Sequence, residues 1–320
     1  MKKYLILFFA FIALSACNKQ QELALKSADK DYILKVANEN FANKKWADAL
    51  VLYERLSNLV AGTDDAPNVV YNSAYANYYD KNYKLAGHQF KNFAVTFPQD
   101  PRVEDAAYMS ALCYYEGSLD YNLDQSNTEL AINEMQNFLN NYPNSEKSKN
   151  INELIDELTY KLEFKAYENA RQYFKMADYK ASSTAFENVL NDFPSTKLRT
   201  KIYDYILKSK YELAVNSIYD LKKDRLEEAS TFAKQVEREM PDSELSKTAA
   251  DLRAKLQKEK ENFAEVEKKV EARKIELAEK QKEAEAQQNA EKDRRDAEKK
   301  AREMKKDSAT AANPVAAPSF

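Results

Sequence analysis

A short phrase with proline at its centre recurs four times in the middle of this 320-residue chain. In each copy an apolar residue precedes the proline, and a serine, threonine or aspartate follows shortly after it. Proline ends a helix because it lacks an N–H and its ring clashes with the preceding turn, and the following hydroxyl or carboxylate can cap the next helix. The prolines are Pro98, Pro143, Pro194 and Pro241. Their spacings of 45, 51 and 47 residues predict a series of similar helical units.

A second pattern places a small residue twelve positions before each proline, with bulky residues four and seven positions after it. This spacing puts all three on one helix face, where the small residue lets a neighbouring helix approach closely. The small residues are Ala49, Ala86, Ala131, Ser182 and Ala229, with Ala61 in place of the proline in the first unit. Helix pairs of roughly 34 residues with this pattern are typical of tetratricopeptide repeats. We predict an all-α fold, with a superhelix of about five such pairs over 29–250 and a long charged helix after it.

The amino-acid composition excludes several classes of function. Three glycines are too few for a Walker loop or a dinucleotide fingerprint, and one histidine with two cysteines cannot build a His/Cys zinc site. No pair of carboxylates stands out by its spacing, so we expect no enzyme, no catalytic residue, no cofactor and no metal. The net charge of −3 disfavours nucleic acid as a partner, because phosphate contacts need a basic face. A binding or scaffolding role is favoured, with the concave surface of the repeats as its default site.

The first seventeen residues are typical of an export signal. Two lysines precede a ten-residue apolar run, which has signal-peptide length, whereas a membrane-spanning helix needs about 20 residues. The run leads into Leu-Ser-Ala and Cys17, which together resemble the bacterial lipobox, and the resemblance implies that Cys17 is lipidated. We predict a lipoprotein signal peptide at 1–16 and a lipidated tether at 17–28, the alternative being an ordinary signal peptide. Cys113 lies in an apolar helical stretch and is predicted to be buried.

The C-terminal part of the chain differs in composition. Residues 251–307 hold 18 Lys or Arg and 16 Asp or Glu without proline or glycine, which predicts a long charged helix. A thin apolar stripe recurs every seven residues at Leu256, Phe263, Val270, Leu277 and Ala284. A solvated single helix, a short coiled coil and specific docking all fit this pattern. Residues 308–320 are predicted to be disordered.

Two stretches resemble the BamD (YfiO) family of outer-membrane β-barrel assembly lipoproteins. The family's third repeat reads R-D-Q-T-x-T, then Ala-Ile, then a helix ending in Tyr-Pro-x-Ser. The matching residues here are Leu123-Asp124-Gln125-Ser126-Asn127-Thr128, Ala131-Ile132 and Tyr142-Pro143-Asn144-Ser145. The stretch from Tyr173-Phe174 to the phrase around Pro194 is similar to the fourth repeat. Two arginines of the family are replaced here, by Leu123 and Ala185.

The resemblance implies a lipid-anchored scaffold of the β-barrel assembly machinery, in the outer membrane and facing the periplasm. Its implied partners are unfolded outer-membrane proteins and a β-barrel assembly protein with periplasmic domains. The candidate client-binding residues are Tyr71, Tyr75, Tyr78 and Tyr79, some of which also fit a core role. The candidate partner-binding residues are Tyr173, Asp178, Tyr179 and Arg199. The alternatives are another periplasmic repeat adaptor, acting in cell-wall synthesis or envelope constriction, and a glycan-binding lipoprotein of the SusD type.

Overall fold

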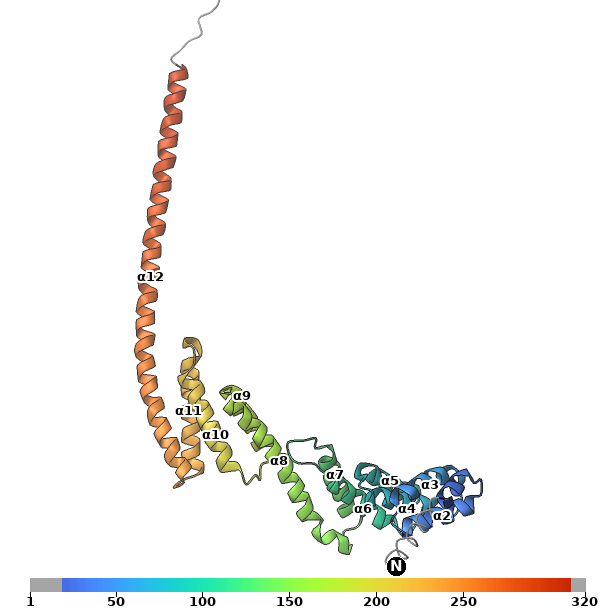
Figure 1. Ribbon diagram of the computed structural model, residues 1–320. Helices are drawn as coiled ribbons and strands as arrows, with labels where there is room; N and C mark the ends of the chain where they lie inside the picture. The colour runs from blue at the N-terminus through green and yellow to red at the C-terminus, as the bar shows by residue number, and fades with distance from the viewer. Residues whose placement is uncertain (1–18, 312–320) are drawn as a thin grey trace, which may run out of the picture. The chain divides into compact units, whose positions relative to one another are not determined.

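The computed structural model describes residues 19–311, with side chains up to residue 305. All regular structure in this part of the chain is helical (Figure 1). The helices are α2 (Lys30–Ala42), α3 (Trp46–Leu59), α4 (Ala66–Tyr79), α5 (Tyr83–Thr96), α6 (Val103–Glu116), α7 (Ser126–Asn141), the short 3-10 helix η1 (Glu146–Asn150), α8 (Ile151–Lys175), α9 (Tyr179–Asp192), α10 (Arg199–Val215), α11 (Tyr219–Glu239) and α12 (Glu244–Ala311). Helices α2 to α11 form five consecutive pairs, and α12 is the long charged helix. The predicted all-α, tetratricopeptide-type fold is confirmed, whereas the signal peptide and Cys17 lie outside the described residues.

The repeated sequence pattern explains why the helices pair. All five small residues of the pattern, from Ala49 to Ala229, are at most 1% exposed. Phe90 and Phe93, which follow the small residue of α5 by four and seven positions, are fully buried. Helices α5, α7, α9 and α11 each end two residues before the proline of the repeated phrase. The small residues thus admit the neighbouring helix, the bulky ones fill the core, and the prolines set the helix ends.

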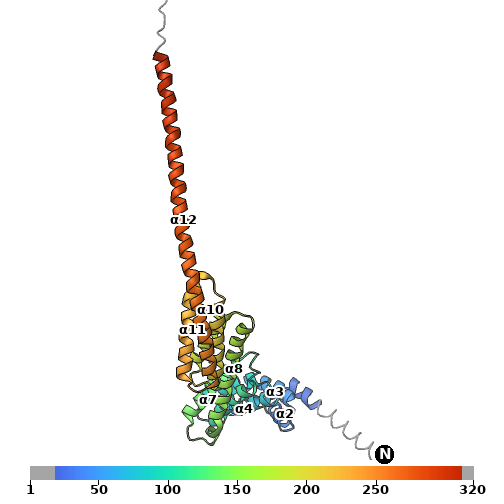
Figure 2. The same cartoon turned by 90° about the vertical axis from the view of Figure 1, so that its left-hand side faces the viewer.

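The described helices belong to two compact units. Of the described residues, the first unit contains those up to Met176 together with Thr184–Lys197, and the second contains Ala177–Ser183 and those from Leu198 to Ala311. In the first unit, helices that are neighbours in the chain from α2 to α8 also pack against each other. In the second unit, α10, α11 and α12 pack together, and α12 runs alongside α11 (Figure 2). Their shared core contains Ala214, Leu226, Ala229, Leu256 and Phe263.

Residues 19–26 are helical and pack on the first repeat, whereas the sequence predicts a tether there. Ala24 is fully buried in the core of α2 and α3. The side-chain amide of Gln21 donates to the carbonyl of Asp48 at 3.0 Å and accepts from Asn40 at 2.6 Å. These two polar contacts and the buried alanine hold the segment on the first repeat.

Helix α12 begins at Glu244, seven residues before the predicted start of the charged helix, and ends at Ala311. It begins there because the hydroxyl of Ser243 accepts from the N–H of Ser246 at 3.0 Å, which is an N-cap. Leu256 and Phe263, the first residues of the apolar stripe, are buried against α10 and α11. The start of the stripe is therefore occupied by packing within the chain.

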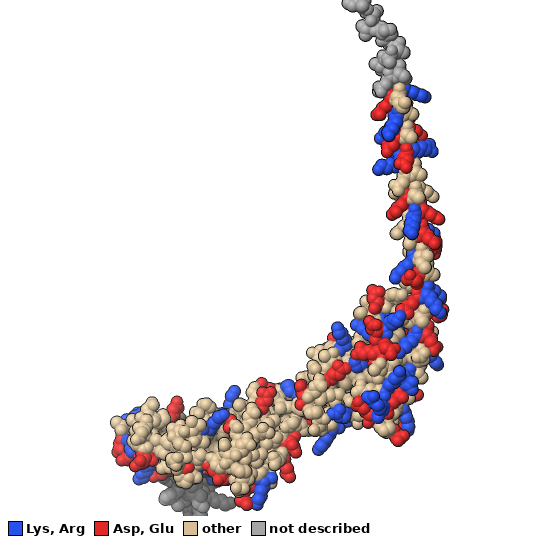
Figure 3. All heavy atoms as spheres, turned by 180° about the vertical axis from the view of Figure 1, so that it is seen from behind, with Lys and Arg blue, Asp and Glu red and all other residues tan. Residues whose placement is uncertain are grey.

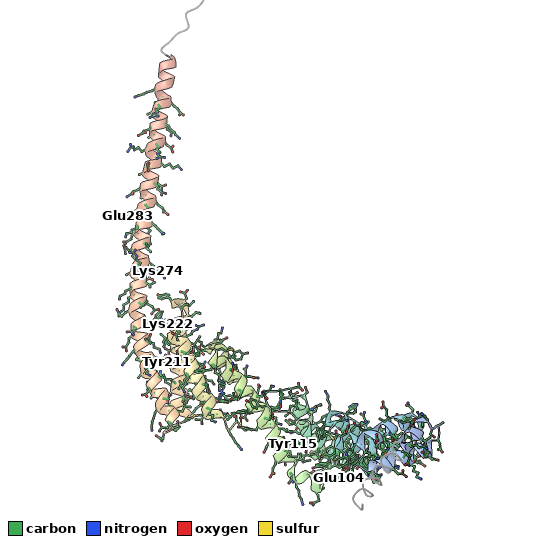
Figure 4. The ribbon with its side chains drawn as sticks, viewed as in Figure 1. Glu104, Tyr115, Tyr211, Lys222, Lys274 and Glu283 are labelled. Atoms are coloured by element: carbon green, nitrogen blue, oxygen red, sulfur yellow. The ribbon has the colours of Figure 1, made fainter. Side chains whose placement is uncertain are left out.

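The rest of α12 is a solvated helix. From Leu277 to residue 305 every side chain is exposed, and acidic and basic residues intersperse along it (Figure 3). Ion pairs one turn apart, such as Lys280 with Glu276 at 2.6 Å, stabilise this helix. The side chains of Lys274 and Glu283 project from it (Figure 4). No helix within residues 19–311 combines the length and apolar character needed to cross a membrane.

Cys113 is buried, as predicted, in the core shared by α4, α5 and α6. Burial raises the pKa of its thiol to about 12. The thiolate is the reactive form of cysteine, so we expect Cys113 to resist alkylation by iodoacetamide at pH 8 in the folded chain and to react fully in guanidinium chloride. Peptide mass mapping would measure this, and equal labelling with and without denaturant would contradict the buried position.

Candidate functional site

Aromatic side chains from three helices form a continuous row in the first unit. Tyr71, Tyr75 and Tyr79 recur every fourth residue on α4, which places them on one side of that helix. Tyr79 stacks on Trp46 with ring centroids 4.5 Å apart and on Tyr75 at 5.9 Å. Tyr75 meets Tyr71 edge-on at 5.0 Å, and Phe41 meets Trp46 edge-on at 5.2 Å. We call these five residues the aromatic row.

The aromatic row leads from the surface into the core. Tyr79 is 47% exposed, whereas Trp46, Tyr75 and Tyr71 are partly buried. At the inner end, Phe90 lies edge-on to both Tyr75, at 4.9 Å, and Tyr71, at 5.9 Å. Tyr79 is therefore the exposed member of the row, with the partly buried Trp46 stacked on it, and Tyr71 and Tyr75 also contribute to the core.

One carboxylate holds the inner end of the row in place. The hydroxyls of Tyr71 and Tyr75 both donate to Oδ2 of Asp105 on α6, the latter at 2.6 Å, and Lys147 of η1 donates to Oδ1. Burial, followed by the hydrogen bond to Asp105, raises the pKa of Tyr71 to about 12 and also raises the pKa of Tyr75. Both phenols consequently stay protonated near neutral pH and act as donors.

A guanidinium group covers the inner end of the row. The guanidinium carbon of Arg102 lies 4.6 Å from the ring centroid of Tyr71, which is a cation–π distance. Its Nε and Nη2 donate to Asp100 at 2.8 and 2.7 Å, and its Nη1 donates to Asn68 at 2.9 Å. Tyr71 is thus fixed by its hydroxyl and by its ring face, so the row is ordered before any ligand arrives.

The Asp105 cluster makes stability depend on pH. Burial by itself would raise the pKa of Asp105, but the hydrogen bonds from Lys147, Tyr71 and Tyr75 outweigh it and lower the pKa. A carboxyl whose folded pKa is lowered contributes stability above its unfolded pKa of about 3.9, and that stability is lost as the pH falls through the folded value. We expect wild type to be more stable than Asp105→Asn at pH 6, and we expect the difference to shrink at pH 3. Urea unfolding at both pH values measures it.

The matched control for this prediction is Asp120→Asn, which alters an exposed carboxyl in the loop after α6 that forms no ion pair within the described part of the chain. Its difference from wild type should change far less between the two pH values. If the stability difference between wild type and Asp105→Asn were the same at pH 6 and pH 3, the cluster would not act through the charge of Asp105.

The structure brings together only some of the predicted client-binding residues. Tyr71, Tyr75 and Tyr79 share the row, whereas Tyr78 lies edge-on to Tyr79 and Tyr83 and packs on the core of α4–α6. Sequence reasoning did not assign Phe41, Trp46 or Asp105 to the site. The sequence did contain one signal that points to Asp105, because Tyr71 and Asp105 are 34 residues apart, which is one repeat length.

The predicted partner-binding residues are divided between the units. Tyr173, which is 41% exposed, belongs to the first unit, whereas Asp178, Tyr179 and Arg199 belong to the second. The carboxylate of Asp178 accepts from the N–H of Ala181 at 3.0 Å and so caps the start of α9. Arg199 begins α10 and lies 5.9 Å from the ring of Tyr203. The four residues do not make up a site within either unit, and their role stays a prediction.

Among the described residues, no group of three or more His, Cys, Asp or Glu side chains is arranged to hold a metal ion. The site consists of stacked rings, one fixed carboxylate and one guanidinium. Such a surface can bind apolar and aromatic side chains by stacking. Stacked helix pairs that carry a surface of this kind define the class of tetratricopeptide-type binding proteins.

Residues 26–227 match the family described as YfiO, outer membrane lipoprotein. Because the match covers more than half of the chain, this chain belongs to the YfiO family of outer-membrane lipoproteins, and the resemblance seen in the sequence is confirmed. The chain is also 22% identical over 178 residues to the outer membrane protein assembly factor BamD of Caulobacter vibrioides. That alignment covers 56% of this chain and 58% of the relative, so it spans little more than half of the relative's length.

A solved structure, the TPR2AB-domain:pHSP90 complex of yeast Sti1, is similar at a TM-score of 0.34 and 14% identity. The similarity covers 74% of this chain and 86% of that one. Its TM-score is too low to bear on the arrangement of the repeats.

Proposed function

We propose that this chain is a lipid-anchored scaffold of the β-barrel assembly machinery that faces the periplasm and binds unfolded outer-membrane proteins. Membership of the YfiO family and similarity to an assembly factor named BamD support the proposal. The observation that carries it is the aromatic row, in which the exposed Tyr79 and the partly buried Trp46 stacked on it offer a surface for apolar side chains. The proposed role is binding and positioning, without a chemical step.

The aromatic row suits a client that must be held and then released. Asp105 and Arg102 fix Tyr71 and Tyr75, and these support Tyr79 by stacking, so binding orders few side chains and costs little entropy. An aromatic pair contributes about 0.5–1.5 kcal/mol beyond the area it buries. Client side chains that stack on Trp46 and Tyr79 therefore bind weakly and reversibly, as transfer to a folding partner requires.

The proposed second contact is with the barrel-forming protein, through Tyr173, Asp178, Tyr179 and Arg199. Affinity purification of the tagged chain from gently solubilised membranes tests the assembly role. We expect recovery of a large β-barrel protein with periplasmic domains. The variant Tyr173→Ala/Arg199→Ala should recover less of it, whereas Lys201→Ala, which removes an exposed charge near the start of α10, should recover as much as wild type.

The same purification also tests the alternative function. Recovery of cell-wall enzymes in place of a β-barrel protein, from a chain that is folded and bound to the membrane, would overturn the assembly role and favour a different periplasmic adaptor.

A further inference from the structure

The loop between α6 and α7 turns polar side chains inward. Gln125 is 6% exposed, and its side-chain amide donates to the carbonyls of Asp120 at 2.8 Å and Leu123 at 3.1 Å. The side-chain amide of Asn127 donates to the carbonyl of Gly117 at 2.7 Å. These bonds satisfy the backbone from within, so the loop has a defined shape.

Helix α8 secures the same loop from the other side. Lys161 donates to the hydroxyl of Ser118 at 2.8 Å, and Lys165 donates to the carbonyl of Leu123 at 2.6 Å. The ring of Tyr121 lies edge-on to Phe164 with centroids 4.8 Å apart. Both lysines are therefore engaged with the loop.

Apolar side chains of this loop face outward. Tyr121 is 37% exposed and Leu123 is 50% exposed. Tyr160 of α8, which is 45% exposed, stacks on Phe164 at 6.0 Å, so Tyr121 and Tyr160 both contact the Phe164 ring. Apolar side chains exposed together on a fixed loop are a mark of interaction surfaces. We call Tyr121, Leu123 and Tyr160 the loop patch.

Tyr160 also lines a pocket of about 370 Å³ between α8 and the turn after α9, within the first unit. The charged and aromatic side chains that line the pocket are Asp156, Glu163, Asp192, Tyr160, Phe193 and Lys197. Glu163 is 7% exposed, and one of its oxygens accepts from the hydroxyl of Thr196 at 2.5 Å. The pocket thus combines three carboxylates and two aromatic rings with one lysine.

The pocket carries a net negative charge, because its three carboxylates, Asp156, Glu163 and Asp192, outnumber its one lysine, Lys197. At the loop patch, by contrast, Lys161 and Lys165 of α8 offset the exposed acidic residues of the loop. The complement of the pocket is therefore a cation, and the loop patch contributes apolar contacts.

We propose that the loop patch and this pocket together form a docking surface for a segment of a partner protein in which an arginine or lysine stands next to apolar residues. The cationic group enters the pocket, where carboxylates bind it and the rings of Tyr160 and Phe193 offer cation–π contacts. The neighbouring apolar side chains cover Tyr121 and Leu123. This surface lies on different helices from the aromatic row and does not depend on the proposed assembly role.

Peptide binding to the full chain, purified in a non-ionic detergent, tests the proposal. The probes are acetyl-Gly-Leu-Arg-Leu-Gly-amide and the same peptide with glutamine in place of arginine, titrated by calorimetry. We expect the arginine peptide to bind about tenfold tighter than the glutamine peptide, and the preference to fall with added salt. Equal binding of the two peptides would overturn the proposal.

Three variants locate the binding site of the peptide. Asp156→Asn/Asp192→Asn removes two exposed carboxylates of the pocket and should abolish the preference for arginine. Glu129→Gln/Glu153→Gln removes two exposed carboxylates that do not line the pocket, and should preserve it. Leu123→Ser should weaken both peptides by the same factor. A preference that survives Asp156→Asn/Asp192→Asn would place the cation elsewhere and refute the docking surface.

Discussion

Replacing Phe90 by alanine is expected to lower the free energy of unfolding of the first unit by about 3–5 kcal/mol, as for other buried aromatic residues. Phe90 is fully buried and supports the rings of Tyr71 and Tyr75. Its loss leaves a cavity under the inner end of the aromatic row. Urea unfolding measures the effect through Trp46, which is the single tryptophan of the chain and lies in the same unit.

The matched control is Val95→Ala on the same helix, where the side chain is 75% exposed. A substitution of this kind should change the free energy of unfolding by at most about 0.5 kcal/mol. A cost for Phe90→Ala as small as that of the control would show that α5 does not supply the core between α4 and α6.

The double substitution Trp46→Ala/Tyr79→Ala should weaken binding of an unfolded outer-membrane protein segment by about 10- to 100-fold, which is typical of aromatic hot spots. Tyr79 is the exposed ring of the aromatic row and Trp46 stacks on it, so the double substitution removes the exposed ring together with its stacking partner. Fluorescence anisotropy of a labelled peptide, taken from the C-terminal strand of a β-barrel outer-membrane protein, measures the affinity.

Tyr219→Ala is the control for this loss, because Tyr219 is 39% exposed, comparable to Tyr79 at 47%, and lies in the second unit, outside the row. Its affinity for the client peptide should stay within about twofold of wild type, as for residues outside a hot spot. Circular dichroism confirms that each variant is folded. Unchanged affinity in the folded double variant would remove the aromatic row from client binding.

The fold could be predicted from the sequence because its determinants are local. Proline fixes each helix end, and a small residue followed by bulky ones at helical spacing fixes the buried face. These rules located Ala86, Phe90 and Phe93 in the core of α5, where the structure has them. The sequence named Tyr71, Tyr75, Tyr78 and Tyr79 together as candidates, and the structure joins three of them, Tyr71, Tyr75 and Tyr79, in one row.

The rest of the site depends on contacts between repeats, which local spacing does not reveal. Tyr71 meets Asp105, and Asn68 meets Arg102, in both cases across 34 residues. Equivalent positions in successive repeats face each other, so the repeat length itself was the signal that would have found Asp105. The segment 19–26 was predicted as a tether because its partners on α2 and α3 are not visible in its own composition.

Site-specific photo-crosslinking in living cells tests the central proposal most directly, with p-benzoylphenylalanine placed at Tyr79 or at Tyr173. From Tyr79 we predict adducts with precursors of outer-membrane proteins, and from Tyr173 adducts with the barrel-forming protein. Adducts with cell-wall enzymes at both positions, or none at either in a folded and membrane-bound chain, would contradict a role in β-barrel assembly.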